Sequence, residues 1–469
     1  MTPDEFRKHG YALIDWITEY LEGIEKYPVT DPSMQPGDVR AALPPHPPSS
    51  PQPFGDVIAD VESIIVPGLT HWQHPKFFAY FPSNSSYPAI LGELMSAGLA
   101  VQGMSWVTSP ACTELETLML DWMQELLDLP PRFRNDSHVG GGVIQGSASE
   151  ATLAAILAAR WRVTGGEVDR TGDTTELVAY ITAHTHSGTE KGLRIAGIGT
   201  DRIRVVPHDS SHAMRVDELV QMIADDRRAG LTPFFVCSSH GTTSSNAFDP
   251  TREIGEVCRR EGIWLHVDAA MSGIAALAPE FRWVNAGLEL ADSYCTNAHK
   301  WMGVNFDCDL FWTADRASLV GALTILPEFL RSKALESGAA VDYRDWQIPL
   351  GRRFRSLKLW FMLRTDGIEP VQAMIREHVA LTQLLADLVE ADERFEIVAP
   401  HPLNLLCVAL RAGDRATDTL IERANNTGEV LFTRTVLDGR VVLRFSIGAR
   451  LTTERHVRAG WELLQSLAE

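Results

Sequence analysis

Hydrophobic positions along most of the chain alternate between the two periods that are typical of strands and of helices. Between residues 177 and 314, short apolar runs recur, and each is followed by polar turn residues. Amphipathic segments such as 215–229 and 251–261 lie between several of these runs and predict helices. The alternation predicts an α/β domain with a largely parallel sheet. Its predicted strands are 177–182, 202–207, 233–239, 263–268, 293–297 and 308–314.

The two ends of the chain follow other patterns. Residues 2–5 begin a helix, with a threonine cap, a proline at the first helical position and a glutamate three residues after the cap. A second N-terminal helix is predicted over 55–66, after a proline-rich connector. Near the C-terminus, a helical pattern ending at about 391 precedes two strands, a helix, a hairpin turned by Asp438-Gly439 and a closing helix. We therefore expect a helical N-terminal segment (1–85), a large domain (86–360) and a small α/β C-terminal domain (361–469).

Composition narrows the class of protein. The chain has 469 residues, a formal net charge of −19 and a pI of about 5.2, which argues against nucleic acid or an anionic membrane as a partner. The N-terminus lacks a secretory pattern and no apolar run reaches the roughly 18 residues of a membrane span, so we expect a cytoplasmic protein. The six cysteines are dispersed without zinc-site spacing, and we interpret them as reduced thiols; no metal site is predicted.

One lysine stands at an unusual place in the pattern. The predicted strand 293–297 is followed directly by Ala298, His299 and Lys300. Lysines are seldom buried without a task, and a buried lysine is suited to Schiff-base chemistry because its pKa shifts readily. Lys300 is therefore a candidate for covalent attachment of a carbonyl compound, provided that other residues supply the rest of such a site.

Further polar groups follow other predicted strands, namely His186, Thr243 and Asp268. Residues 146–149 precede a predicted helix, whose free N–H groups and positive dipole end favour an anion. Pyridoxal phosphate requires a lysine for its aldehyde, an acid for its ring nitrogen, a stacking group and a phosphate site. Because ligands of parallel sheets bind at the carboxyl ends of strands, we expect these groups in one crevice. Taken singly, Asp268 and the serines are also compatible with helix caps, and His186 with an ordinary surface histidine.

Several longer motifs stand at these places: His-Pro-Lys-Phe-Phe-Ala-Tyr-Phe-Pro (74–82), Gly-Val-Ile-Gln-Gly-Ser-Ala-Ser-Glu-Ala-Thr (142–152), His-Ser-Gly-Thr-Glu-Lys (186–191), Trp-Leu-His-Val-Asp-Ala-Ala (264–270) and Asn-Ala-His-Lys-Trp (297–301). Through them the chain resembles the group II pyridoxal-phosphate-dependent amino-acid decarboxylases, most closely the aromatic-L-amino-acid decarboxylases. The resemblance runs nearly from end to end. It implies fold type I, with a mainly parallel central sheet and helices on both faces. It also implies a homodimer with active sites at the subunit interface, and an N-terminal segment that packs on the partner subunit.

The resemblance assigns roles by position. Lys300 would hold pyridoxal 5'-phosphate, Asp268 would face its ring nitrogen and His186 would stack on its ring. Other cofactor contacts would be Ala148, Ser149, Thr243, Ala270, Asn297 and His299. The substrate pocket would be formed by Trp72, Tyr80, Phe81, Pro82, Gln102, Met104, Phe306 and Gly351, although the aromatic stretch 70–88 is by composition also compatible with an ordinary core. The implied reaction is decarboxylation of an aromatic L-amino acid (Trp, Phe, Tyr or DOPA) to the amine and CO2.

Two features depart from the family pattern. Phe329 stands where these enzymes usually carry a catalytic tyrosine, and phenylalanine has no hydroxyl with which to donate a proton. The same replacement goes with aromatic acetaldehyde synthases, which release the aldehyde, CO2, NH3 and H2O2, so this reaction is the alternative prediction. A proton from His186, Tyr343 or water would preserve amine formation. Gln102 and the adaptable Met104 leave a non-aromatic substrate such as methionine open.

Rival functions exist on the same fold. Arg444 is compatible with a carboxylate clamp, as in a transaminase, but we favour a structural ion pair. A protein that only binds the cofactor would not need Lys300, Asp268 and His186 together. The polar segment 326–345, which contains Phe329, lacks clear periodicity and is interpreted as a loop.

Overall fold

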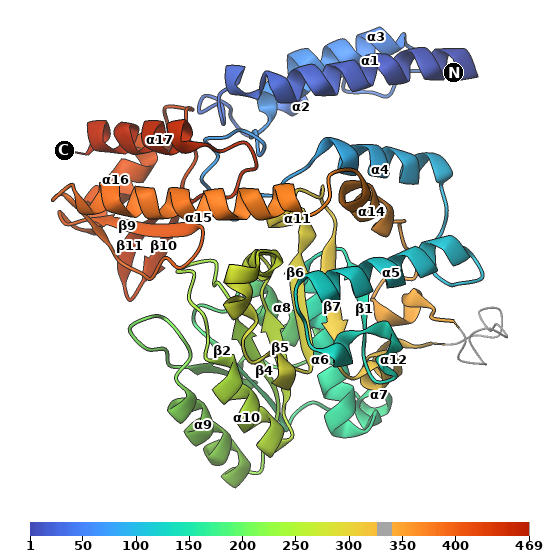
Figure 1. The fold of residues 1–469 in the computed structure, drawn as a ribbon, viewed down its shortest axis with the longest axis vertical. Coiled ribbons are helices and arrows are strands. Elements are labelled where there is room, and N and C mark those ends of the chain that lie inside the picture. Colours follow the sequence, from blue (N-terminus) through green and yellow to red (C-terminus); the bar gives the residue numbers. More distant parts are fainter. Residues whose placement is uncertain (326–339, 469) are drawn as a thin grey trace. The chain divides into compact units, whose positions relative to one another are not determined.

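The computed structural model describes residues 1–325 and 340–468, which form two compact units (Figure 1). One unit contains Met1–Pro82, Ala380–Val398 and Asn404–Glu469. The other contains Ser83–Val379 and Ala399–Leu403. Each unit has its own sheet, and Lys300 lies in the second unit. The segment 326–339 with Phe329 lies outside the described residues.

A seven-stranded sheet forms the centre of the second unit, in the order β1-β7-β6-β5-β4-β2-β3 (Figure 1). The strands from β6 to β3 are parallel, whereas β7 runs antiparallel to both of its neighbours. All the predicted strands between 177 and 314 are therefore confirmed, and so is the predicted α/β class. The strands are β1 (Gly141–Gln145), β2 (Leu177–Thr182), β3 (Ile203–Val206), β4 (Thr232–Ser239), β5 (Trp264–Asp268), β6 (Ser293–Asn297) and β7 (Asp309–Thr313).

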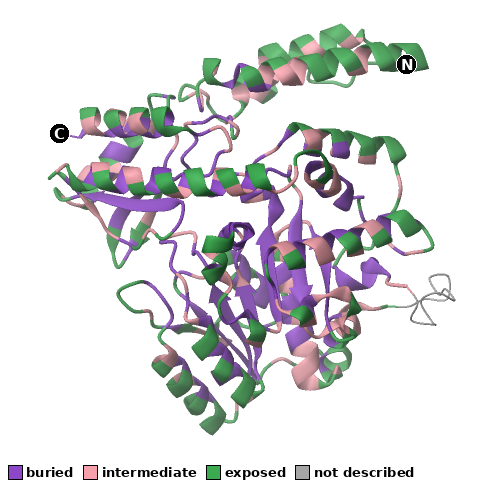
Figure 2. Cartoon of the chain, in the orientation of Figure 1, coloured by how far each residue is buried: buried purple, intermediate pink, exposed green. Residues whose placement is uncertain are grey.

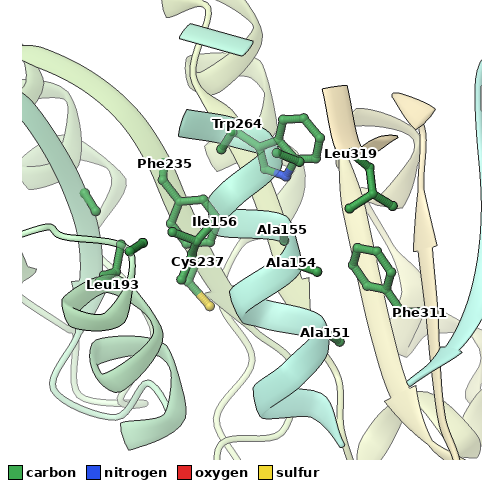
Figure 3. Close-up of a cluster of buried hydrophobic side chains, with 14 of the residues drawn as sticks. Ala151, Ala154, Ala155, Ile156, Leu193, Phe235, Cys237, Trp264, Phe311 and Leu319 are labelled. Carbon is green, nitrogen blue, oxygen red and sulfur yellow. The ribbon is translucent and has the colours of Figure 1, made fainter. Parts of the chain in front are cut away.

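These strands are short apolar runs because helices cover both faces of the sheet. Every residue of β1, β2 and β7 is buried (Figure 2). On one face, the small residues of α6 (Ala148–Thr164) share a buried cluster with Phe311 of β7 and Trp264 of β5 (Figure 3). On the other face, α10 (Thr251–Glu261) approaches so closely that a Cβ on Gly255 would meet Leu265 at 3.4 Å. Because successive side chains of a strand alternate in direction, Trp264 and Leu265 lie on opposite faces of the sheet.

The remaining helices of the second unit include the predicted segment 215–229, observed as α9 (Val216–Arg228). The helical pattern that ends at about 391 is two helices, α14 (Ser356–Thr365) and α15 (Glu369–Glu390), because the chain turns at Gly367 with a φ of 70°. Helix α15 begins in the second unit, and from Ala380 onward it belongs to the first. The others are α4 (Tyr87–Leu99), α5 (Pro110–Leu126), α7 (Glu167–Thr171), α8 (Ser187–Ile195), α11 (Ala298–Trp301) and α12 (Arg316–Leu323).

The first unit contains the predicted N-terminal and C-terminal elements. Helix α1 (Pro3–Glu22) has the expected capping box, since the Thr2 hydroxyl and the Glu5 carboxylate cap each other's backbone N–H groups. The hairpin turn at Asp438 and Gly439 has both residues at positive φ, as type I′ turns require. The antiparallel sheet has the order β10-β11-β9-β8. Its elements are α2 (Asp38–Ala42), α3 (Phe54–Asp60), β8 (Phe395–Ile397), β9 (Leu405–Leu410), α16 (Asp414–Asn425), β10 (Thr433–Leu437), β11 (Arg440–Ser446) and α17 (Glu454–Leu467).

Three further features that the sequence analysis discussed can be located in the structure. All six cysteines are buried and none is in a disulfide, as predicted. Arg444 is buried in β11, where its guanidinium donates to the Thr433 hydroxyl and the Tyr80 carbonyl. Among the described residues, no helix combines the length and the apolar character that a membrane span needs.

Candidate active site

The candidate cofactor residues follow the carboxyl ends of the parallel strands. Asp268 is the last residue of β5 and Asn297 the last of β6. Lys300 follows in α11 and is partly exposed, while Thr243 lies in the loop after β4. His186 caps the N-terminus of α8, which comes after β2. The sheet therefore brings to one edge the residues that the sequence had only placed after separate strands.

Helix α11, which carries Lys300, is held by hydrogen bonds from a preceding segment. The Asn84 side chain donates to the Lys300 carbonyl at 2.7 Å, and the Ser83 hydroxyl donates to the His299 carbonyl at 3.0 Å. Nδ1 of His299 accepts from the Cys308 N–H at 2.9 Å. Burial, and next the charge of Lys300, lower the pKa of His299 to about 3, so this ring stays neutral beside the lysine. The backbone of Lys300 is thus fixed without any use of its amine.

Asp268 is oriented by its own turn. Its Oδ1 accepts from the Ala270 N–H at 3.0 Å, and its carbonyl accepts from the His240 N–H at 2.8 Å. In the sheet it is in register with Cys295 of β6, which belongs to the cluster packed on α6. The carboxylate therefore stands on the α6 face of the sheet, and Ala270 shapes the backbone beside it.

A second carboxylate, Asp309, lies in this region and was missed by the sequence analysis. It is fully buried at the start of β7, directly opposite Asn297 of β6. Burial, and next the charge of Asp268, raise its pKa well above the ordinary value, whereas Lys300 acts in the opposite direction. The charges of Asp268 and Lys300 therefore both influence the pKa of Asp309. The sequence did contain a signal for this residue, because a carboxylate inside a predicted buried strand is unusual and needs a physical explanation.

Asp309 makes a pH-dependent contribution to stability that a substitution can isolate. Because its pKa is raised on folding, the native protein keeps a proton that the unfolded chain releases. From the ordinary carboxyl pKa of about 3.9 up to the raised value, the unfolding free energy falls by up to about 1.4 kcal/mol per pH unit through this group. Asp309→Asn is expected to remove that slope and to be more stable than the parent at neutral pH.

Urea unfolding of the parent and of Asp309→Asn, from mildly acidic to neutral pH, measures this effect. The exposed Asp56 in α3 provides a matched control, because Asp56→Asn deletes a carboxylate from the surface. The slope should change only in the Asp309 variant. Equal slopes in the parent and in Asp309→Asn would contradict the assignment.

The first turns of α6 and α8 lie side by side. A Cβ on Gly188 would meet the Ser149 hydroxyl at 2.6 Å and Nδ1 of His186 at 2.9 Å, so only glycine fits between these two groups. Ser147 caps α6, with Ala148 and Ser149 in its first turn. Nδ1 of His186 accepts from the Gly188 N–H at 3.1 Å, which places the proton of the neutral ring on Nε2. Two helix N-termini with a serine hydroxyl are well suited to a phosphate group.

The predicted substrate-pocket residues fall into two groups. In the second unit, Oε1 of Gln102 accepts from the Arg352 N–H at 2.5 Å, and a Cβ on Gly351 would meet its Nε2 at 3.1 Å. Met104 lies two residues further along the same loop, and Phe306 is 62% exposed with its ring edge-on to His299. Gln102 is therefore engaged by the backbone beside Gly351. In the first unit, Trp72 stacks on Tyr80 with ring centroids 5.6 Å apart, whereas Phe81 and Pro82 are buried.

Tyr343 is not placed to donate a proton to a substrate, contrary to one of the alternatives drawn from the sequence. Its side chain is fully buried and its hydroxyl is paired with the Thr117 hydroxyl at 2.9 Å. Burial raises the pKa of this phenol far above its ordinary value. Tyr343 therefore belongs to the buried hydrophobic cluster that contains α6, and its ring meets Trp346 edge-on.

Comparisons with known proteins agree with this geometry. Residues 36–411 match the family described as pyridoxal-dependent decarboxylase conserved domain. Phenylacetaldehyde synthase of Arabidopsis thaliana is 45% identical, over 100% of this chain and 96% of the relative. Aromatic-L-amino-acid decarboxylase of Mus musculus is 44% identical, over 100% of this chain and 98% of the relative. A crystal structure of Oryza sativa TDC with PLP and tryptamine has a TM-score of 0.95 at 38% identity, covering 100% of this chain and 98% of that chain.

The fold and the strand-end residues thus define a fold type I enzyme that depends on pyridoxal phosphate. More narrowly, the chain belongs to the pyridoxal-dependent decarboxylase family, as its motifs had indicated. Its cofactor is pyridoxal 5'-phosphate. Transamination and simple cofactor binding are accordingly not its class of function.

Proposed function

We propose that this chain decarboxylates an aromatic L-amino acid to the corresponding amine and CO2. The observation that carries the proposal is the convergence of Asp268, Lys300 and His186 on one edge of the sheet. It is supported by full-length similarity to an aromatic-L-amino-acid decarboxylase and to a rice structure that holds tryptamine, an aromatic amine.

The residues of the site fit pyridoxal phosphate. Ala148 and Ser149 at the start of α6, beside the N-terminus of α8, would hold the phosphate. Asp268 would pair with the ring nitrogen, His186 would stack on the ring and Lys300 would attach the aldehyde carbon through its amine. Thr243, Ala270, Asn297 and His299 would complete the wall at the same strand ends. When bound, the cofactor supplies the electron sink that allows the carboxylate to leave as CO2.

The chain's own residues would set the charges around that sink. Asp268 would provide a negative charge that favours a proton on the ring nitrogen, and this would stabilise developing electron density. His299 stays neutral, so it does not compete with the positive charge of Lys300. Nε2 of His186 carries a proton because Nδ1 accepts a backbone hydrogen bond. The amine of Lys300 would also be a group that can transfer protons at the site.

A second candidate function is oxidative decarboxylation to an aromatic acetaldehyde. It is favoured by Phe329, which has no hydroxyl to deliver a proton to the carbon that CO2 leaves, and by the similarity to a phenylacetaldehyde synthase. In this reaction the amino acid, O2 and water give the aldehyde, CO2, NH3 and H2O2. The amino-acid carbon is oxidised, and O2 takes up the two electrons and two protons as peroxide.

Product analysis distinguishes the two functions. The cofactor-loaded enzyme is incubated with Trp, Phe, Tyr, DOPA and Met, with and without oxygen, and CO2, amine, aldehyde and peroxide are measured. Amine without peroxide supports the first function, and peroxide in equal amount to the aldehyde supports the second. The first function predicts CO2 release from at least one aromatic substrate, and the absence of CO2 from every substrate would sink both. CO2 from methionine alone would make the substrate non-aromatic.

A substitution at position 329 tests the role given to the missing hydroxyl. If the parent enzyme forms aldehyde, Phe329→Tyr is expected to raise the ratio of amine to aldehyde at least about 100-fold, the size typical of a general acid. Phe329→Leu is the matched control, because it also changes the side chain but adds no hydroxyl. An unchanged product ratio in the tyrosine variant would show that position 329 does not decide the product.

We also propose that the active enzyme is a cytoplasmic homodimer with active sites at the subunit interface. Support comes from apolar side chains exposed on two helices, including Phe6 and Tyr11 on α1 and Leu91, Leu94 and Leu99 on α4. The proposed packing of segment 1–85 on the partner subunit would cover the first group.

Six buried free thiols agree with a reducing compartment. Sedimentation of the cofactor-loaded enzyme and cell fractionation test the two parts; a monomer or a secreted protein would contradict them.

A further inference from the structure

Three histidines, His184, His208 and His212, form a cluster in the second unit that the decarboxylase chemistry does not use. Their potential ligand nitrogens all lie within 4.8 Å of one another. His184 and His212 are buried and His208 is partly exposed, so the cluster is both shielded and reachable from solvent. We propose that these residues form a three-histidine site for a borderline divalent metal ion, with Zn²⁺ as the best-fitting ion.

The sheet explains why residues so far apart in the chain meet here. Thr182 of β2 and Val206 of β3 are register partners in neighbouring parallel strands. His184 and His208 each stand two residues beyond these strand ends, so the two loops leave the sheet side by side. The chain then turns, and Met214 pairs back with His208, which returns His212 to the same place. The topology alone therefore juxtaposes the three imidazoles.

The ring geometry matches tetrahedral zinc. Zinc holds imidazole nitrogens at about 2.0–2.1 Å, which places the centroids of neighbouring rings about 5 Å apart. The three centroid separations in the cluster are 4.6, 4.9 and 5.4 Å, with rings inclined at 66°, 63° and 52°. The separations of the rings are therefore close to those that one shared zinc ion requires. Three protein ligands leave the fourth position for water or a small ligand.

Groups around the cluster orient its ligands. Nδ1 of His208 donates to the Asp209 carbonyl at 3.0 Å, because a carbonyl only accepts, so Nε2 of the neutral ring bears the lone pair. The Asp209 carboxylate accepts from the N–H groups of Ser211 and Ala213 and closes the turn between two of the histidines. Asp249 anchors the end of that turn by accepting from the Met214 N–H at 2.7 Å. The loop is thus fixed before any ion binds.

The ligand set selects the kind of metal. Three imidazole nitrogens favour Zn²⁺, Cu²⁺, Ni²⁺ or Co²⁺, whereas Mg²⁺ and Ca²⁺ prefer oxygen ligands. Three residues separate His208 from His212, which matches the spacing of the two histidines in zinc-finger patterns. The sequence analysis missed the site because the third ligand follows a different strand. The assignment does not depend on the proposed decarboxylation.

Metal titration of the cofactor-loaded enzyme tests the site. The protein is dialysed against a chelator and titrated with Zn²⁺ in competition with a chromophoric chelator. We expect one equivalent per chain, and Co²⁺ should give the visible bands of a four-coordinate ion. His208→Asn and His212→Asn should each weaken binding by at least about 100-fold, the upper range seen for the loss of an outer contact.

His138→Asn is a matched control. His138 and His212 both have a positive φ, 64° and 62°, and asparagine tolerates this backbone region. His138→Asn should leave the zinc affinity unchanged. Absorption of the bound cofactor and thermal unfolding show whether each variant is folded; if His212→Asn is not, His208→Asn decides. Equal zinc affinity in the parent and in His208→Asn, or no stoichiometric binding by the parent, would overturn the proposal.

Discussion

Lys300→Ala is expected to lower kcat/KM for decarboxylation by at least about 10³-fold, which corresponds to about 4 kcal/mol of transition-state stabilisation. The substitution removes the covalent attachment of the cofactor and the amine that transfers protons. The fold should persist, because Asn84 and Ser83 hold the backbone of α11 and not the lysine side chain. The measurements are CO2 release and the visible absorption band of the lysine-bound cofactor.

Substitutions of two other lysines show whether the expected loss of activity is specific to Lys300. Lys358 is completely buried and forms ion pairs with Glu93 at 3.0 Å and Asp307 at 3.6 Å. Lys358→Met should therefore lower the free energy of unfolding. At temperatures at which this variant is folded, it should retain the absorption band of the lysine-bound cofactor. The exposed Lys191, five residues after His186, serves as a surface control, and Lys191→Ala should change neither property. A Lys300→Ala variant that retains both the band and turnover would refute the role of Lys300.

Asp268→Asn is expected to lower kcat by about 10²–10³-fold, the usual cost of removing one electrostatic contact to a transition state. The amide keeps the size of the carboxylate, and its oxygen can still accept from the Ala270 N–H. What is lost is the negative charge that holds a proton on the cofactor ring nitrogen. The cofactor should therefore still attach to Lys300, while the electron sink becomes weaker.

The loss of the Asp268 charge can be recognised because it changes kcat and KM to different extents. Asp268→Asn should change kcat far more than KM, and Asp268→Glu should recover part of the activity, since the charge is restored. The Asp309→Asn variant is a useful comparison, because it removes a neighbouring carboxyl group whose raised pKa keeps it protonated, so that no charge is lost. Equal losses in both variants would show that the loss of a carboxyl group from this region, and not the loss of the negative charge of Asp268, controls the reaction.

Much of the fold was predictable from residue patterns. The strands between 177 and 314 were identified because burial on both faces requires continuous apolar runs, and polar turns punctuate them. The N-terminal capping box and the Asp438-Gly439 hairpin depend on local backbone chemistry, which the sequence displays directly. The break at Gly367 was missed because the hydrophobic period continues across it.

Within the site, residues next to strand ends were easier to find than residues inside strands. Lys300, Asp268 and His186 could be proposed from the sequence because motif and strand end coincide, and the structure places all three after strands of the sheet. Asp309 was missed because its meaning depends on pairing with Asn297 across an antiparallel strand, and register is not visible in a single strand. Tyr343 was a plausible donor by residue type, but the packing of its hydroxyl against Thr117 excludes it.

The sequence by itself determined the class of fold and the cofactor, and it predicted the residues that would anchor the cofactor, because these depend on local period and on motifs of adjacent residues. The tertiary structure decided which groups share an environment: the burial of Asp309 between charges, the fit of Gly188 between Ser149 and His186, and the meeting of three histidines from two loops. The physical reason is that pKa shifts, close contacts and metal geometry depend on distances between residues far apart in the chain, and only strand order and register set those distances.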